Sequence, residues 1–439
     1  MLVNLAEAKQ KLRKRDVRVT GLNGACHIED ATGAKLQEVA VLDVNKASEV
    51  FDAEAPPVEV EIVRDGARLT APSSHAHGSK GDMSWAMPRL TKWCEASARP
   101  GYLTLKAHEY LDEDSVLHAK VRLLASMLRE AKSAVAYTGA GISVSAGIPD
   151  WATKHVDSSA AALTPQELAK VAASARPTLA HRVLTSAHFA GLLPKWVQQN
   201  HDGLPQKAGF PQQAMNEIHG AIFDPSNPLV PMDGKVRDDL HTDLLHCQRG
   251  HDLVLALGSS LAGMAADELV TVVADRARRG KALGVVIINL QQTVRDEDAA
   301  LRIFAPLDRV AALLAEELQL SVLEMGNLYT PRVPQEHRLG EDIFSTVYGH
   351  HGCLLPAGED RKTLDLSQGA SVKITAGPRR NTLATVDGKD EEGHYLLRVG
   401  SPEAEEFLLL GSWWIEAAVL GTTSYFPVTS TLQPCNAMG

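Results

Sequence analysis

The sequence predicts a doubly wound α/β core built on a parallel sheet and flanked by two smaller β-rich domains. Short apolar runs of the kind found in buried parallel strands alternate with helical segments through the middle of the chain. Glycine or polar residues follow each of these runs directly, at the end of a strand where open α/β sheets bind ligands. On both sides of this region the composition changes to short strands and turns, which indicates separate domains.

Length, composition and charge limit the classes of protein that fit. With 439 residues the chain is long enough for two or three domains, each with its own core. A hydrophobic content of 44% beside 22% charged residues is typical of globular proteins. The formal net charge of −10 argues against broad affinity for nucleic acid, so no direct nucleic-acid partner is expected. No apolar run has the length needed to cross a bilayer, so no membrane partner is expected either.

The cysteines indicate a reducing compartment. They are odd in number, scattered and without a C-x-x-C pair: Cys26, Cys94, Cys247, Cys353 and Cys435. Neither a disulfide framework nor a four-cysteine zinc site is indicated, and an intracellular location follows. Basic residues near the N-terminus precede no apolar run, so they are not a secretory signal. Nuclear and cytoplasmic locations both fit, and a mitochondrial presequence stays open.

Residues 1–100 are predicted to form a small β-rich domain with a linker. The stretch Val58–Val63 alternates at period two, and Arg64–Gly66 supplies a hairpin-type turn. Val17–Thr20 is a further candidate strand. The stretch Pro72–Asp82 is rich in serine, histidine and glycine, which predicts a mobile linker. No catalytic constellation occurs here, so the hypothesis is an interaction domain.

The central domain, residues 101–325, is predicted to begin with a helix that leads into a buried strand. Glu113–Ser115 is a helix start, and apolar residues follow at helical spacing as far as Leu128. The apolar run Ala134–Ala136 then predicts a parallel strand. These residues form core, and no function is assigned to them.

A glycine-rich stretch, Tyr137–Trp151, follows this strand and reads Y-T-G-A-G-I-S-V-S-A-G-I-P-D-W. Without Cβ atoms, Gly139, Gly141 and Gly147 let the backbone turn sharply and approach a ligand. Ser143 could cap a following helix. A strand, a glycine-rich turn and a helix N-terminus together favour an anion such as a pyrophosphate. The spacing differs from G-x-G-x-x-G, so the glycines alone fit an ordinary tight turn equally well.

Three further strands continue the pattern. Trp196–Val197 is followed by the polar sequence Q-Q-N-H-D-G-L. Leu253–Leu257 ends in G-S-S, and Val285–Ile288 ends in N-L-Q. The predicted helices open at Thr164 and Arg176 or span Ala265–Arg279 and Leu307–Leu318. Strands that alternate with helices in this way are typical of a doubly wound sheet.

Three motifs in this order resemble the signature of the sirtuin family of NAD-dependent protein deacylases. The glycine-rich stretch is similar to the family's G-A-G-I-S…G-I-P-D-F-R. The sequence Q-N-H-D-G-L at 199–204 is similar to Q-N-x-D-G-L, and E-I-H-G at 217–220 is similar to E-L-H-G. The segment A-R-P-T-L-A-H at 175–181 resembles one found particularly in the nuclear sirtuins. The resemblance covers roughly residues 115–325 and neither flanking domain.

The resemblance implies a Rossmann-like core that binds NAD⁺ at the carboxyl edge of its sheet and takes an acylated lysine of a protein substrate. The implied reaction transfers the acyl group to ADP-ribose and releases nicotinamide. In this reaction His219 would be the base that activates a ribose hydroxyl, a task that suits an imidazole. Asn200 would hold the ribose and help to order water, and Asp202 would fix the nicotinamide carboxamide.

The same resemblance implies which residues contact NAD. They belong to the glycine-rich stretch and to the strand ends: Thr138, Gly139, Ala140, Gly141, Ser143, Asp150, Trp151, Gln199, Asn200, Gly258, Ser259, Ser260, Asn289 and Gln291. Trp151 replaces the family's usual phenylalanine and keeps an aromatic ring that can cover the reacting groups.

The chain departs from the family pattern in three ways. Between Gly220 and Leu253 it contains only Cys247, where family members carry two cysteine pairs that bind structural zinc. Histidines around this cysteine could bind a metal, but a polar loop is the better interpretation and no metal site is predicted. Ala152 replaces the motif arginine. His201 lies beside the nicotinamide position, where a small aliphatic residue is usual.

Two hypotheses of different classes follow. The first is an active NAD-dependent protein-lysine deacylase or a close relative such as an ADP-ribosyl transferase, and the presence of Asn200, Asp202 and His219 favours it. The second is a catalytically weak, sirtuin-like domain that binds NAD or nothing and serves as a structural or scaffolding element. The missing cysteine pairs and the missing motif arginine favour this alternative.

Residues 326–439 are predicted to form a small barrel or sandwich of about five strands. Four of these are Val372–Thr375, Thr382–Val386, Tyr395–Val399 and Phe407–Leu410. The adjacent tryptophans Trp413 and Trp414 follow, and we expect one in the core and one at the rim. Both flanking domains are candidate surfaces for protein partners.

Overall fold

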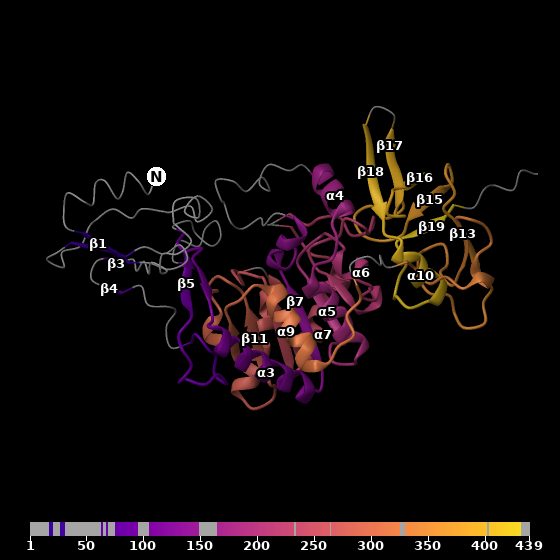
Figure 1. Ribbon diagram of the computed structural model, residues 1–439. Helices are drawn as coiled ribbons and strands as arrows, with labels where there is room; N and C mark the ends of the chain where they lie inside the picture. Colours follow the sequence, from indigo (N-terminus) through magenta and orange to yellow (C-terminus); the bar gives the residue numbers. More distant parts are fainter. Residues whose placement is uncertain are drawn as a thin grey trace, which may run out of the picture.

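A six-stranded parallel sheet forms the centre of the molecule in the computed structural model (Figure 1). The structure describes residues 75–94, 105–148, 165–231, 234–263, 265–324, 330–401 and 404–431, with four short strands nearer the N-terminus. The strand order is β12-β11-β10-β7-β8-β9. The strands are β7 (Ala134–Thr138), β8 (Lys195–Gln198), β9 (Met215–Glu217), β10 (Leu253–Leu257), β11 (Gly284–Ile288) and β12 (Leu301–Ile303). The predicted parallel core is confirmed.

Helices cover both faces of this sheet, because successive side chains of each strand point to opposite faces. One face packs against α3 (Asp114–Glu130), α5 (Leu179–Phe189) and α9 (Leu307–Leu318). The other face packs against α7 (Asp238–Gly250) and α8 (Glu268–Arg278). The core is therefore doubly wound, as the sequence predicts. None of the helices in the described ranges has both the length and the apolar character needed to cross a membrane.

The registers of the central strands bring their carboxyl ends together. β7, β10 and β11 are buried along their whole length, which explains their nearly continuous apolar sequences. Leu257 at the end of β10 lies opposite both Thr138 and Ile288, the last residues of its two neighbours. Chain order reverses between β7 and β10. Ligands of open α/β sheets bind at such a reversal, outside the carboxyl ends of the strands.

Most helices begin close to their predicted starts. α3 begins directly after Glu113, α4 spans Pro165–Ser174, and α9 has the predicted bounds. Thr178 caps α5, since its hydroxyl accepts a hydrogen bond from the backbone of His181 and the imidazole accepts one in return. The ring of His181 stacks against Trp196, and burial lowers the pKa of this histidine to about 4. This part of the A-R-P-T-L-A-H segment is therefore structural.

The described strands nearest the N-terminus form two antiparallel pairs. β1 (Val17–Thr20) pairs with β2 (His27–Asp30), and β3 (Val63–Arg64) pairs with β4 (Ala67–Arg68). β1 has the predicted bounds, and the second pair is the predicted hairpin. The rest of the predicted strand, 58–62, lies outside the described residues.

Residues 75–82 pack on the core, which corrects the prediction of a mobile linker for this part. The side chains of Ala76 and His77 are buried. The amides of Ser79 and Lys80 donate to carbonyl groups just before β12 at 2.9 and 2.8 Å. Glycine and serine are common in linkers. In this segment their small side chains leave the backbone amides accessible, so the backbone can lie close against the sheet.

A third antiparallel pair brackets the predicted domain boundary near residue 100. β5 (Arg89–Lys92) pairs with β6 (Glu109–Leu111). The amide of Tyr110 in β6 donates to the carbonyl of Leu290, which follows β11, at 2.8 Å. This pair therefore joins the core directly.

The C-terminal part, which we call the C-terminal domain (330–401 and 404–431), contains a five-stranded antiparallel sheet (yellow and orange in Figure 1). Its order is β18-β17-β16-β15-β19. The strands are β15 (Ser371–Ile374), β16 (Leu383–Lys389), β17 (Tyr395–Ser401), β18 (Ala404–Leu410) and β19 (Val428–Ser430). β13 (Ile343–Thr346) and β14 (Lys362–Asp365) form a separate pair. Since β18 and β19 are not paired in the described part of the chain, the sheet is not a closed barrel.

Both adjacent tryptophans lie in the core of the C-terminal domain, which corrects the prediction of one at the rim. Trp413 and Trp414 are 5% and 1% exposed. They open α10 (Trp413–Leu420), a helix with apolar residues on all sides. Neither ring therefore lies at the rim, whereas Leu420 at the other end of the same helix is 50% exposed.

Candidate functional site

The candidate site lies at the carboxyl edge of the parallel sheet, where β7 ends at Thr138. After it the chain forms two short 3-10 helices, Ala140–Ile142 and Val144–Ala146, instead of the start of a long helix. Ser143 lies between them and makes no capping hydrogen bond. Its hydroxyl donates to Oδ2 of Asp202 at 2.6 Å. The predicted cap is therefore wrong, and the hydroxyl connects the first motif to the second.

The glycines of the first motif let two loops pack together. A Cβ on Gly141 would lie 2.7 Å from the Cα of Gly258, and one on Gly139 would lie 2.9 Å from the carbonyl oxygen of Gly258. The amide of Gly141 donates to that same oxygen at 2.9 Å. The sequence predicts that these glycines make room for a ligand, but the loop after β10 occupies the room. Gly147 has a φ of +82° and open space around it, so it serves the turn itself.

Asp202 fixes the loop that follows β8. Its side chain is 3% exposed and accepts the hydrogen bond from Ser143. Its other oxygen accepts from the amide of Leu204 at 3.0 Å and from Nε2 of Gln198 at 3.5 Å. A buried carboxylate with several donors is held firmly in place, so the loop has one well-defined conformation.

Two side-chain amides extend this hydrogen-bonded set across the sheet edge. Asn200 is half-buried, and its Nδ2 donates to the carbonyl of Gly139 and to Oγ of Ser143, both at 3.1 Å. Gln199 is half-buried as well, and its Nε2 donates to Oγ of Ser259 at 3.1 Å. The end of β8 is therefore joined to the loops after both β7 and β10.

Asp267 belongs to the same set, and sequence reasoning missed it. It is 3% exposed and accepts from the hydroxyl of Tyr137 at 2.7 Å and from Gln199 at 3.3 Å. The amide of Gly263 donates to its second oxygen at 2.9 Å. The only signal in the sequence is an acidic residue at the start of the predicted helix Ala265–Arg279. Acidic residues are common at helix starts, so the signal does not point to a site.

His219 follows β9 at the same edge of the sheet. β9 is parallel to β8, with Glu217 opposite Gln198, so the loops after both strands leave on the same side. His219 is 7% exposed. Nδ1 of His201, in the loop after β8, donates to the carbonyl of Gly220 at 2.9 Å. The loops that carry Asn200, Asp202 and His219 are therefore in direct contact, and burial lowers the pKa of His201, which favours its neutral form.

Of the other residues predicted to contact NAD, some are buried and support the sheet, and others are partly exposed at its edge. Thr138 is fully buried and its hydroxyl accepts from Nε1 of Trp196 at 2.8 Å, so it supports the sheet. The carbonyl of Ser259 accepts from Nδ2 of Asn289 at 3.0 Å. The half-buried members at the edge are Ala140, Ser260, Asn289 and Gln291. Asp150 and Trp151 lie outside the described residues, as does Ala152.

Cys247, the cysteine closest to where the family pattern has its zinc ligands, lies in the core. Cys247 is 2% exposed and packs between α7 and the sheet. Burial raises the pKa of its thiol to about 12. A thiol with such a pKa stays protonated, whereas a zinc ligand is a thiolate. The described residues include no group of three or more metal-binding side chains.

The fold and the site together define a doubly wound α/β protein with its candidate site at the switch point between β7 and β10, where open α/β sheets bind ligands. The half-buried groups at this edge are neutral amides and a hydroxyl from the strand ends. Such groups suit the hydroxyls of a ribose and the edge of a nucleobase.

Comparison with known proteins finds similarity to several NAD-dependent protein deacetylases. No family model matches the chain. The NAD-dependent protein deacetylase sirtuin-7 of Bos taurus is 32% identical over 276 residues, which cover 52% of this chain and 66% of that protein. Its counterpart in Homo sapiens is 31% identical with the same coverage. The NAD-dependent protein deacetylase SRT1 of Arabidopsis thaliana is 28% identical over 49% of this chain and 52% of that protein.

Over about half of its length the chain is similar to proteins of the sirtuin family. It spans slightly less than two thirds of the length of the sirtuin-7 proteins and about half the length of SRT1. Among solved structures, one Sir2 enzyme matches at 20% identity with a TM-score of 0.39, over 46% of this chain and 98% of that one. A Sir2 complex with a p53 peptide and NAD⁺ matches at 25% identity with a TM-score of 0.37, over 44% and 97%.

Proposed function

We propose that this protein is an NAD-dependent protein-lysine deacylase. The observation that carries the proposal is the hydrogen-bonded set of Ser143, Asn200 and Asp202 at the switch point of the sheet, with His219 in the adjoining loop. The resemblance assigns Asn200, Asp202 and His219 to the reaction and Ser143 to the contact with NAD. The relatives that are named NAD-dependent protein deacetylases support the same activity.

The chemistry of the sheet edge fits NAD as the cofactor. The half-buried amides of Gln199, Asn200 and Asn289 can donate to and accept from ribose hydroxyls and an adenine ring. Gln199 and Asn200 follow β8, and Asn289 follows β11. All three donate hydrogen bonds to the loops after β7 or β10, so few groups have to be ordered on binding. When bound, NAD supplies a ribose carbon from which nicotinamide can leave.

Each residue of the set has a distinct task in the proposed reaction. The imidazole of His219 accepts a proton from a ribose hydroxyl. Asn200 presents its amide to the ribose while its Nδ2 holds the glycine-rich loop. Asp202 and Ser143 keep the two loops at a fixed separation through their 2.6 Å hydrogen bond.

The proposed substrate is an acylated lysine of another protein, and the proposed location is intracellular, in the nucleus or the cytoplasm. The flanking β-rich domains are candidate surfaces for binding protein partners. The A-R-P-T-L-A-H segment favours the nucleus, because it resembles the nuclear branch of the family.

Nicotinamide release from NAD⁺ tests the proposal. We expect purified protein to release nicotinamide only when an acylated-lysine peptide is present. His219→Ala should lower this release by about 10²- to 10⁴-fold, the usual contribution of a general base. The matched control is His246→Ala, since His246 is an exposed histidine of α7.

Two other results would contradict the proposal. Release that does not depend on peptide would indicate glycohydrolase or ADP-ribosyl transferase chemistry. No release with any acyl group, beside a rise in melting temperature on addition of NAD⁺, would indicate the alternative of a scaffold that binds NAD.

A further inference from the structure

The C-terminal domain holds the segment that follows His219 in the chain. We call residues 221–237, which run from the E-I-H-G motif to α7, the linking segment. The backbone amide of Gly411 donates to the carbonyl of Phe223 at 3.0 Å. The hydroxyl of Tyr425 donates to Oδ2 of Asp224 at 2.5 Å. Two parts of the C-terminal domain therefore hold successive residues of the linking segment.

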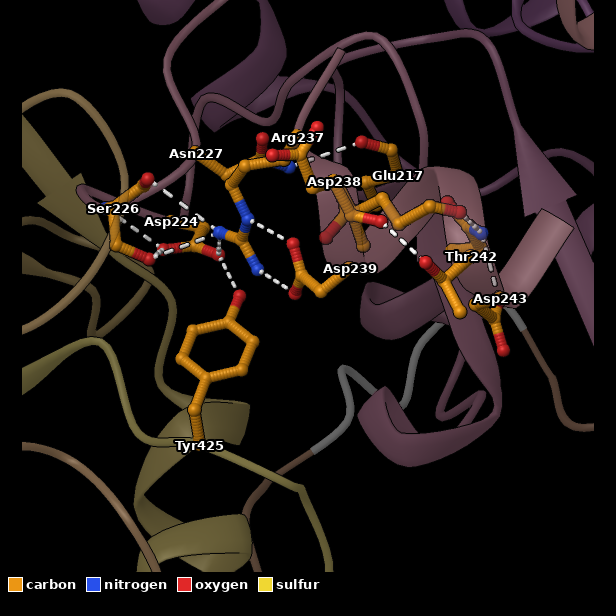
Figure 2. A network of polar contacts seen from close by, with 12 residues as sticks. Glu217, Asp224, Ser226, Asn227, Arg237, Asp238, Asp239, Thr242, Asp243 and Tyr425 are labelled. Carbon is orange, nitrogen blue, oxygen red and sulfur yellow. Dashed lines mark hydrogen bonds and ion pairs between the residues drawn. The ribbon is translucent and has the colours of Figure 1, made fainter.

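A buried polar network surrounds Asp224 (Figure 2). The backbone amide and the hydroxyl of Ser226 donate to its Oδ1 at 2.9 and 2.6 Å. The guanidinium of Arg237 lies 3.8 Å from Oδ2, forms two hydrogen bonds to Asp239, and lies over the ring of Tyr425 at 4.6 Å. The carboxylate of Asp224 is buried, so the loss of any one of these partners leaves its charge poorly compensated. Each partner therefore helps to hold Asp224 in position.

Tyr425 is the member that comes from the C-terminal domain, and Figure 2 shows it pointing from that domain toward Asp224. Burial and the charge of Asp224 raise the pKa of Tyr425 well above its ordinary value. The hydroxyl therefore stays protonated and remains a donor to the carboxylate.

Aromatic rings form the apolar half of the same interface. The ring of Phe223 lies 5.2 Å from Trp413 and 4.7 Å from His394, measured between centroids. A Cβ on Gly203 would lie 2.7 Å from Phe223 and 2.9 Å from Trp413. Since Gly203 directly follows Asp202, the ring of Phe223 packs between the site loop and the C-terminal domain.

The backbone of the linking segment is joined to both site loops. The amide of Ile222 donates to the carbonyl of His201 at 3.0 Å. The amide of Val230 donates to the carbonyl of His219 at 2.9 Å. His201 in turn donates to Gly220 through its ring. A displacement of the linking segment would therefore displace both site loops.

We propose that the C-terminal domain positions the reactive loops, and that Tyr425 is a positioning residue which acts through Asp224 and the linking segment. The inference rests on the proposed function. Hydrogen bonds, an ion pair and packed rings hold the linking segment.

The test compares two variants that each remove one phenolic hydroxyl. In Tyr425→Phe the ring stays but the hydrogen bond to Asp224 is lost. The matched control is Tyr348→Phe, because Tyr348 is 1% exposed and its hydroxyl donates to the carbonyl of Thr423 within the C-terminal domain at 2.6 Å. We expect Tyr425→Phe to lower kcat for peptide-dependent nicotinamide release about tenfold with KM for NAD⁺ within about twofold, since small misplacements of reacting groups reduce rate. Tyr348→Phe should leave kcat within about twofold.

Hydrogen exchange of backbone amides gives a second readout that needs no turnover. Mass spectrometry of peptides covering 215–230 should show faster exchange in Tyr425→Phe and unchanged exchange in Tyr348→Phe. If the wild-type protein releases no nicotinamide, the proposed function fails and exchange alone decides whether Tyr425 holds the linking segment. An unchanged kcat in Tyr425→Phe of an active enzyme overturns the positioning role. Unchanged exchange overturns it as well, and so do equal effects of the two substitutions.

Discussion

At the scale of single residues, Glu217 is the most perturbed carboxyl group near the site. It is 5% exposed, and Nε2 of Gln212 donates to its Oε2 at 3.3 Å. Its Oε1 has no hydrogen-bond partner among the described residues. Burial, with the charge of Asp224 as a smaller cause, raises the pKa of Glu217 from 4.5 to about 8. Glu217 is therefore largely protonated at neutral pH.

This pKa predicts that stability falls as pH rises. The folded protein binds the proton of Glu217 more tightly than the unfolded chain, so the stabilisation is complete below about pH 4.5 and is lost as pH approaches 8. Glu217→Gln removes the titrating group. The free energy of unfolding of this variant should therefore fall less steeply with pH than that of the wild type, by up to about 1.4 kcal/mol per pH unit. Urea unfolding at pH 6, 7 and 8 measures it, with Glu268→Gln on the exposed surface of α8 as control. Equal slopes for the wild type and Glu217→Gln would contradict the prediction.

The sequence alone shows the residues of the site but not their burial. Asn200, Asp202 and His219 are recognisable because each lies in a short motif directly after a strand. The roles of Asp224 and Asp267 are not recognisable, because each depends on donors far away in the chain, such as Tyr425 and Tyr137. A buried acid and an exposed one look the same until the fold brings their partners together.

At the scale of elements, the candidate site depends on the close contact of two loops. Gly258 has a φ of +60°, and a Cβ there would lie 2.7 Å from the backbone nitrogen of Ile142. The contact is between backbone atoms, which cannot move aside by a change of rotamer. The loops after β7 and β10 can therefore stay together only if this position lacks a side chain.

Gly258→Ala should destabilise the protein by about 2–4 kcal/mol, because it combines a strained φ with overpacking. The control is Gly280→Ala, where φ is +67° and a Cβ would meet nothing within 4 Å. This change should cost only about 1 kcal/mol, the strain of the left-handed conformation alone. Denaturant unfolding of both variants measures the difference. Equal losses would show that packing between the two loops contributes nothing.

Strands and helices of the core could be predicted well, but the turns between them could not. Buried parallel strands such as β10 have continuous apolar sequences, and α9 has a regular apolar repeat, so the predicted bounds agree with the structure. The turn after β7 depends on what each glycine meets. The sequence favours a ligand at Gly141, whereas the structure has the loop of Gly258 there.

At the scale of the whole molecule, the core and the C-terminal domain share one hydrophobic cluster. Ala172 of α4 and Phe223 of the linking segment belong to the same cluster as Trp413 and the strands of the C-terminal sheet. Arg176, just after α4, pairs with Glu392 in the turn between β16 and β17 at 3.3 Å. The apolar and polar contacts of this interface resemble those within a domain.

This interface predicts that the two parts stay together after the chain is cut. With a protease site inserted within 325–329, the cleaved fragments should elute as one species in size-exclusion chromatography. Phe223→Ala should weaken this association by about 3–5 kcal/mol, the usual cost of removing a buried phenylalanine. The control is Phe189→Ala, since Phe189 at the end of α5 is 66% exposed. Separate elution of fragments that are otherwise wild type would contradict the prediction.

The order in which the chain is synthesised gives this interface a further consequence. Tyr425 lies 201 residues after Asp224. At about 5–20 residues per second, a ribosome needs roughly 10–40 s to make the intervening chain. The core strands can pair during that interval, because β7 to β11 precede residue 289. The loops that carry Asp202 and His219 acquire this anchor only after residue 425 has been made, so a nascent chain can fold its core well before these loops are held in place.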